Sequence, residues 1–202
     1  CNPVDYAPLR AICAFSDTNL IVTSGGSFGW YNGNTNRSDC SIRPLLTGSI
    51  NKMWGISSND FYVVGNDGNI AHYNGSQWTK IESGTTLHLT DIWGNSELIL
   101  GISSSFGTPD PSKILVITSP VDSLASDISN ALSTTWFKNN HKIYVGGSGI
   151  YSKTTHGWKR ESGLSQFYSF LIRGSDVNNI WACGGFGTVY HFNGITWKNY
   201  PE

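Results

Sequence analysis

The sequence predicts an all-β protein assembled from five copies of one short antiparallel unit. Aromatic residues and charged residues each make up 13% of the 202 residues, and 23 residues are glycine. This composition is typical of strands joined by tight turns, and it excludes a disordered chain or a coiled coil. Apolar and polar residues alternate in short runs, as expected of strands. One pattern of aromatic, glycine and asparagine-glycine residues also recurs along the chain.

The clearest repeat relates residues 50–83 to residues 169–201. Aromatic, glycine and histidine residues coincide in the two segments at a density that chance does not explain. The coincident pairs are Trp54 with Arg173, Gly55 with Gly174, Asp60 with Asn179, Tyr62 with Trp181, Gly65 with Gly184, His72 with His191, Tyr73 with Phe192 and Trp78 with Trp197. Weaker copies occupy residues 9–46, 87–126 and 128–163, so five copies cover essentially the whole chain.

Each copy is expected to form four short strands. In the second copy we place them at residues 52–56, 61–64, 70–73 and 78–82, because β-branched and aromatic residues alternate there with polar ones. The Asn-Gly and Asn-Asp-Gly sequences between these runs supply the positive φ angles that tight hairpins need. Four antiparallel strands in every ~40 residues are typical of the blades of a β-propeller.

We therefore predict a five-bladed β-propeller of four-stranded antiparallel blades, forming a single domain over residues 1–202. Each blade is expected to consist of consecutive chain. The approximate boundaries of the blades are residues 8–46, 47–83, 84–126, 127–165 and 166–202.

These motifs resemble the β-propeller superfamily over the full length of the chain. The repeat resembles a pattern of bacterial exported proteins, W-G-x-S-x-x-D-x-Y-x-V-G-x-x-G-x-[IL]-x-H-Y-[ND]-G-x-x-W. Gly184-Gly185, Tyr190 and Trp197 also make the last copy kelch-like. The first and fourth copies lack the histidine, and the third lacks the late tryptophan. The resemblance implies the fold, but β-propellers serve binding, scaffolding and catalysis alike, so it does not imply one function.

The recurring tryptophans and histidines are interpreted as structural. Trp54, Trp93 and Trp136 recur at the end of the first strand, and a second set recurs in the fourth strand, so each is expected to fill the same gap between blades. A ring of sugar-stacking tryptophans is the alternative. His72 and His191 occupy equivalent positions with no recurring acidic partner. We therefore expect hydrogen-bonded structural histidines and no metal site.

The sequence contains no evident catalytic set. A glycoside hydrolase needs two carboxyl groups at the mouth of its site, and Glu82 and Glu161 occupy equivalent positions of the repeat. Asp91 is the best single candidate, because other copies carry Lys52 or Leu171 at its position. No G-x-S-x-G motif of a serine hydrolase is present. We predict no catalytic residue and no cofactor.

A glycine-rich loop with a phenylalanine recurs between the second and third strands of three copies. Phe28, Phe106 and Phe186 each lie in such a loop. We predict that they form an aromatic rim that binds a protein partner or a glycan, with Asp91 as a further binding residue. Inward packing of these rings is the alternative.

The first residue and the cysteines bear on location. Cys1 resembles the mature N-terminus of a bacterial lipoprotein, in which thiol and amine carry lipid. A secreted protein whose leader ended before a cysteine, or an arbitrary sequence boundary, is the alternative. If Cys1 is not lipidated, we expect a disulfide with Cys40, because residues 2–8 can span ~23 Å and so cross a blade. Cys13 and Cys183 are expected to be small buried apolar residues.

Taken together, the sequence favours an exported protein, with or without lipid on Cys1, that acts as a binding or scaffolding module at the cell surface, outside the cytoplasm. A formal net charge of −1 argues against nucleic-acid binding, which needs a basic face. Membrane association is expected only through lipid on Cys1. One alternative is a polysaccharide-active hydrolase or lyase. The other is a structural subunit of an extracellular assembly.

Overall fold

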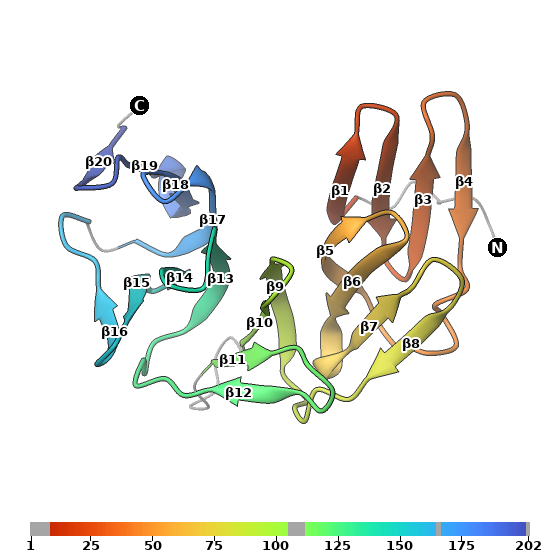
Figure 1. The fold of residues 1–202 in the computed structure, drawn as a ribbon, viewed down its shortest axis with the longest axis horizontal. Helices are drawn as coiled ribbons and strands as arrows, with labels where there is room; N and C mark the ends of the chain where they lie inside the picture. Colours follow the sequence, from red (N-terminus) through yellow and green to blue (C-terminus); the bar gives the residue numbers. More distant parts are fainter. Residues whose placement is uncertain (1–8, 105–111, 165–166, 201–202) are drawn as a thin grey trace. The chain divides into compact units, whose positions relative to one another are not determined.

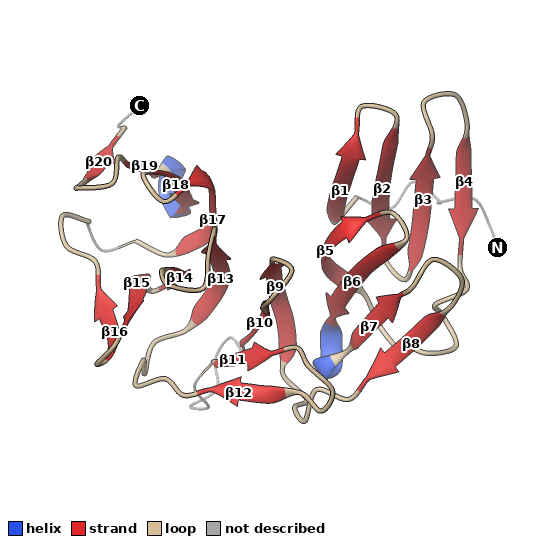
Figure 2. Cartoon of the chain, in the orientation of Figure 1, coloured by secondary structure: helices blue, strands red, loops and turns tan. Residues whose placement is uncertain are grey.

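The computed structural model describes residues 9–104, 112–164 and 167–200, which contain five four-stranded antiparallel sheets (Figures 1 and 2). In each sheet the four strands are consecutive in the chain and pair in sequence order. Helix in this part of the chain is confined to two three-residue 3₁₀ turns, η1 (Asn66–Gly68) and η2 (Gly185–Gly187). No helix among the described residues is long and apolar enough to cross a membrane.

The chain forms two compact units. The first unit contains Cys1–Ile92 and Ile117–Asp122, and the second contains Trp93–Val116 and Ser123–Glu202. The division passes through the third sheet. That sheet consists of β9 (His88–Gly94), β10 (Ile99–Ser104), β11 (Lys113–Val116) and β12 (Asp122–Leu124).

The first unit holds the first two blades, which bury an aromatic core between them. The first blade consists of β1 (Ala11–Ser16), β2 (Asn19–Ser24), β3 (Ser27–Tyr31) and β4 (Asn36–Asp39). The second blade consists of β5 (Ile50–Ser57), β6 (Asp60–Gly65), β7 (Ile70–Tyr73) and β8 (Trp78–Ile81). Phe28 stacks on Trp78 with the ring centroids 5.1 Å apart, and both rings contact Phe61 edge-on. Offset and edge-to-face pairs of this kind add stability beyond the area that they bury.

The second unit holds the last two blades, packed in the same way. The fourth blade consists of β13 (Leu132–Phe137), β14 (Ile143–Gly147), β15 (Gly149–Thr154) and β16 (Gly157–Arg160). The fifth blade consists of β17 (Ser169–Asp176), β18 (Asn179–Gly184), β19 (Val189–Phe192) and β20 (Trp197–Asn199). Trp136 and Tyr144 of the fourth blade pack in one buried cluster with Ile172, Tyr190 and Trp197 of the fifth.

The equivalent histidines make equivalent contacts, as predicted. His72 Nε2 lies 2.7 Å from Asp60 Oδ1, and His191 Nε2 lies 2.8 Å from Asn179 Oδ1. Each ring also stacks on the aromatic residue opposite it on the neighbouring strand, which is Tyr62 in the second blade. A carboxylate and an amide serve at the same position, so the histidine needs an acceptor there rather than a negative charge. Both histidines are structural.

A glycine at the end of the second strand allows a close crossing in three blades. A Cβ atom at Gly65, Gly147 or Gly184 would overlap the carbonyl oxygen of Ser49, Ala131 or Tyr168, respectively. In each case the next N–H donates to that same carbonyl, at 3.0, 2.9 and 3.0 Å. The repeated glycine therefore joins the chain segment that enters the first strand to the end of the second. We call this contact the glycine junction.

The glycine junction can be tested by adding one methyl group. Gly184→Ala is expected to destabilise the protein by about 1–3 kcal/mol, because the new Cβ overlaps Tyr168 O and the Phe167 ring. Gly185→Ala is the matched control, because a Cβ at that position meets no atom within 4 Å. Urea unfolding followed by tryptophan fluorescence measures both. Equal stability of the two variants would contradict the role of the junction.

Candidate functional site

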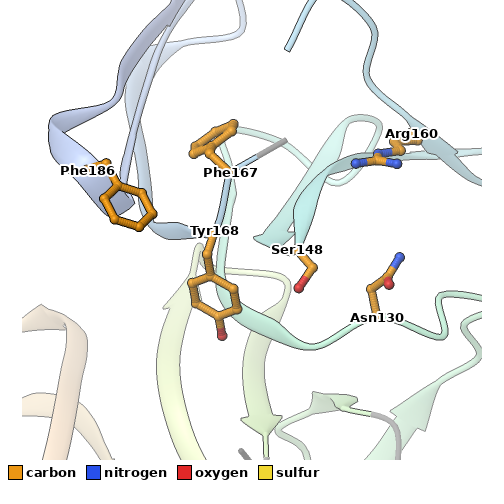
Figure 3. Close-up of a pocket in the computed structure, with 6 residues that line it drawn as sticks. All are labelled: Asn130, Ser148, Arg160, Phe167, Tyr168 and Phe186. Atoms are coloured by element: carbon orange, nitrogen blue, oxygen red, sulfur yellow. The ribbon is translucent and has the colours of Figure 1, made fainter. Parts of the chain in front are cut away.

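A cleft of about 420 Å³ lies in the second unit, at the ends of strands of the fourth and fifth blades. Its lining residues are Asn130, Ser148, Arg160, Phe167, Tyr168 and Phe186. Figure 3 shows that the three aromatic rings lie on one side of this cleft and the three polar side chains on the other. We call these sides the aromatic half and the polar half.

Two glycine junctions bring these residues together. Asn130 precedes the junction carbonyl of Ala131, and Ser148 is the residue whose N–H donates to it. In the fifth blade, Phe167 precedes the junction carbonyl of Tyr168. A β-bridge between Ser148 and Tyr168 connects the two junctions. The backbone therefore sets the position of the cleft lining.

Phe186 occupies an unusual conformation at the tip of η2. Its φ and ψ angles are 58° and 38°, in the left-handed region, and its side chain is fully exposed. Asp67 adopts nearly the same angles, 56° and 36°, in the equivalent turn of the second blade. Aspartate, asparagine and glycine tolerate this region, whereas a bulky residue is strained there. A strained residue that packs against nothing in its own unit is more consistent with function than with packing.

The other two aromatic residues are held by their neighbours. The Phe167 ring lies 4.9 Å from the Tyr190 ring, and the Tyr168 ring lies 5.4 Å from the Phe170 ring. Burial raises the pKa of the Tyr168 phenol above its ordinary value, and a hydrogen bond with Ser133 opposes this rise. Tyr168 therefore stays neutral at physiological pH. The aromatic half combines two supported rings with one exposed ring.

Arg160 supplies the positive charge of the polar half. Its guanidinium group passes close to Gly149, where a Cβ would lie 3.0 Å from Arg160 Nε, and Gly149 itself has a φ of +114°. The backbone of Arg160 pairs with that of Tyr151 in the sheet, but within the described ranges its guanidinium group makes no hydrogen bond and no ion pair. A guanidinium group in this state presents a planar set of N–H donors that matches a carboxylate. Asn130 Nδ2 donates to the Tyr151 hydroxyl at 2.7 Å, which holds that amide beside Arg160.

The prediction that Phe28 forms part of an exposed rim is wrong. The hairpin that precedes it closes through a two-residue turn, with Ser24 opposite Ser27. Phe28 is therefore the second residue of β3 and points into the core, where it is completely buried. In the fifth blade the corresponding turn has three residues and places Phe186 at its tip. The two motifs are alike in sequence, but the difference in turn length places the Phe28 ring in the core and the Phe186 ring in solvent.

The remaining predicted site residues divide into two groups. Phe106 and Cys1 lie outside the described residues. Asp91 lies in β9 and is only 1% exposed, so its carboxylate does not face solvent. It belongs to the first unit, whereas Phe186 belongs to the second.

Cysteine pairing is described for three positions. Cys40 is disulfide-bonded. Because its expected partner, Cys1, lies outside the described residues, the Cys1–Cys40 pairing stays a prediction. Cys13 and Cys183 are free thiols. Cys13 is half-buried, and this burial raises the pKa of its thiol. Cys183 is exposed, so the expectation that it is a buried apolar residue is wrong.

Sequence reasoning missed five of the six lining residues. Arg160, Asn130 and Ser148 carry no motif. A signal did exist for Phe167 and Tyr168. At the equivalent junction position the second and fourth blades carry the small residues Ser49 and Ala131, whereas the fifth carries tyrosine. The cleft lining offers aromatic surfaces and N–H donors, with no pair of carboxylates among its described residues.

Comparison with solved structures confirms the fold class. Ycf48 bound to a D1 peptide has a TM-score of 0.70 and 14% identity, over 95% of this chain and 66% of that chain. The WD40 β-propeller domain of Doa1 has a TM-score of 0.70 and 11% identity, over 94% and 66%. PorZ, a surface component of the type-IX secretion system of Porphyromonas gingivalis, has a TM-score of 0.67 and 10% identity, over 96% and 28%.

The chain is therefore a β-propeller with five four-stranded antiparallel blades. It spans about two thirds of the length of the Ycf48 and Doa1 chains that it matches. No family model matches the chain, and no curated protein matches it. The kelch-like character of the repeat stays a prediction.

The strain at Phe186 predicts that its replacement stabilises the protein. Phe186→Gly is expected to raise the free energy of unfolding by up to about 1 kcal/mol, because glycine enters the left-handed region without steric cost. Asp67→Gly in the equivalent turn is the control and should give a smaller gain, because aspartate already tolerates this conformation. Thermal and urea unfolding measure both variants. A clear loss of stability in Phe186→Gly would show that the ring packs against the protein.

Proposed function

We propose that this protein is a binding module that takes a segment of a partner polypeptide into the cleft of its second unit. The observation that carries this proposal is Phe186, a fully exposed aromatic side chain held in a strained conformation beside two further rings. The local cost of this arrangement is offset when a partner covers the ring.

The chemistry of the lining indicates which segment fits. Aromatic residues and arginine are the residue types that dominate the binding energy of protein interfaces. The aromatic half suits one large apolar side chain, and Arg160 suits a carboxylate. A cleft of about 420 Å³ is within the range of pockets that enclose small ligands or a few side chains. The ligand class is therefore an acidic peptide that contains an aromatic or large aliphatic residue.

Ycf48 with a D1 peptide bound, a solved structure of the same fold, supports a role in peptide binding. PorZ, described as a bacterial surface component of a secretion system, supports the location part of the proposal. The likeness in each case is one of fold, at 14% and 10% identity. The proposal includes a scaffolding role at the cell surface, outside the cytoplasm, with lipid on Cys1 as one means of attachment.

Selection from a peptide library tests the proposal. The full chain is panned against a phage-displayed library of random peptides, with Phe186→Ser as the counter-selection. We expect enrichment of sequences that combine an acidic residue with an aromatic or large aliphatic one. The enriched peptide should bind Phe186→Ser at least about tenfold more weakly, as expected of an interface hot spot.

The charge of the cleft is tested with the same peptide. Arg160→Met should weaken binding and reduce its dependence on salt, because the ion pair with the peptide is lost. Lys159→Met is the matched control, because Lys159 is the exposed neighbour of Arg160 on β16 and does not line the cleft. Isothermal titration at two salt concentrations measures both variants. Enrichment that does not depend on Phe186, or binding of glycans alone on an array, would overturn the proposal.

A further inference from the structure

An Asn-Gly turn joins the third and fourth strands in the first, second and fifth blades. The turns begin at Asn32, Asn74 and Asn193, and all three asparagines are exposed. The glycines that follow them have φ angles of +94°, +91° and +97°. In each turn the N–H of the asparagine donates to the carbonyl three residues later, at 3.3, 3.2 and 3.3 Å. The three turns therefore share sequence, backbone conformation and exposure.

An asparagine that precedes glycine can react with its own backbone. The glycine nitrogen attacks the asparagine Cγ and forms an N–C bond, while the Cγ–Nδ2 bond breaks and ammonia leaves with the proton that the glycine nitrogen loses. Water then opens the five-membered imide at either carbonyl, which gives aspartate or isoaspartate. Glycine favours the attack because it has no side chain to shield its nitrogen. The only co-reactant is water, so the rate depends on how easily the turn opens.

In the second blade four hydrogen bonds hold the turn closed. Asn74 Oδ1 accepts from the backbone N–H groups of Ser76 and Gln77 and from the Ser76 hydroxyl, at 2.9–3.1 Å. The Tyr73 hydroxyl donates to the carbonyl of Gly75 at 3.0 Å. The attack requires the carboxamide to turn away from its donors and the glycine peptide to rotate. Each of these hydrogen bonds therefore opposes deamidation.

The first blade repeats this arrangement with different residues. Asn32 Oδ1 accepts from the N–H groups of Asn34 and Thr35 and from the Thr35 hydroxyl, at 2.9–3.1 Å. The Tyr31 hydroxyl donates to the carbonyl of Gly33 at 2.7 Å. Two bonds from side-chain hydroxyls thus support two bonds from the backbone, as in the second blade.

In the fifth blade the described residues form only the two backbone bonds. Asn193 Oδ1 accepts from the N–H groups of Ile195 and Thr196, at 3.0 and 2.9 Å. Phe192 occupies the position of the tyrosine, so it has no hydroxyl to donate to the carbonyl of Gly194. Ile195 is 86% exposed, so its side chain does not hold the turn by packing. This turn keeps the reactive sequence and lacks the two bonds that restrain it elsewhere.

We propose that Asn193 is the site at which this protein deamidates, and that side-chain hydroxyls protect the equivalent Asn32 and Asn74. Each hydrogen bond in the comparison lies within a single hairpin. Asn193 lies at the opposite end of β19 from Phe186, and the site shares no residue with the cleft that carries the proposed function.

The isoaspartate product has a structural consequence in the same hairpin. It lengthens the main chain by one atom at position 193, directly beside the pair that Phe192 forms with Trp197. Trp197 is buried, and its Nε1 donates to Glu161 Oε2 at 3.2 Å. Isoaspartate therefore disturbs the seating of β20, whereas aspartate keeps the acceptor oxygen of the turn.

The three turns can be compared in one sample. The full chain is incubated at mildly alkaline pH, digested at low pH and analysed by tandem mass spectrometry, which locates the one-dalton mass gain. We expect Asn193 to deamidate at least about fivefold faster than Asn32 or Asn74, because two fewer hydrogen bonds must break. In guanidinium chloride, where the turns are unfolded, the three sites should react at similar rates.

Two variants change the restraint in opposite directions. Tyr73→Phe removes one hydrogen bond and should accelerate deamidation of Asn74 by about threefold or more, with Asn32 as the unchanged reference in the same sample. Ile195→Ser places a hydroxyl at the position of Ser76 and should slow the reaction at Asn193. This exposed turn residue makes no core contact, so the second variant remains informative if Tyr73→Phe fails to fold.

Three results would overturn the proposal. The first is an equal or slower reaction at Asn193 than at the other two sites in the folded protein. The second is a preference for Asn193 that persists unchanged in guanidinium chloride, which would assign it to local sequence. The third is the absence of any rate change in both variants. Phe186→Ser should leave all three rates unchanged, which separates this test from that of the cleft.

Discussion

The glycine junction is the constraint on which the rest of the structure depends. At Gly65, Gly147 and Gly184 the end of the second strand lies directly against the carbonyl of the segment that enters the first strand. Only a residue without a side chain allows this approach. The N–H of the next residue donates to the same carbonyl, so the close approach also pairs two backbone polar groups. In these three blades one small residue therefore fixes the end of the inner pair of strands at which the first strand begins and the second ends.

The candidate site follows from this constraint. The cleft residues are ordinary in type, but two adjacent junctions place them around one volume. The features specific to the fifth blade are local. Phe167 and Tyr168 lie directly before β17, and Phe186 occupies the position that Asp67 has in the second blade. The repeated fold determines where the cleft residues lie, and a few residue differences at its turns determine what the cleft can bind. This division is common in proteins whose function resides in loops on a rigid framework.

Local patterns in the sequence predicted the strands closely. In the second blade the expected runs at residues 52–56 and 61–64 lie within Ile50–Ser57 and Asp60–Gly65, because alternation and Asn-Gly turns are determined over a few residues. The burial of the Phe28 side chain could not be predicted from such local patterns. It depends on whether a glycine-rich turn has two or three residues, and one residue moves a side chain to the other face of a strand. The fold alone places Arg160 in the cleft lining, and no motif in the sequence marks this residue.

Amide hydrogen exchange resolved by nuclear magnetic resonance tests the junction most directly. The N–H groups of Ser148 and Gly185 donate to the carbonyls of Ala131 and Tyr168, at the two crossings that build the cleft. The account predicts that these two amides exchange as slowly as those of the central strands, although both lie just beyond strand ends or in a turn. Exchange as rapid as that of an exposed loop amide, such as that of Gly163, would contradict it.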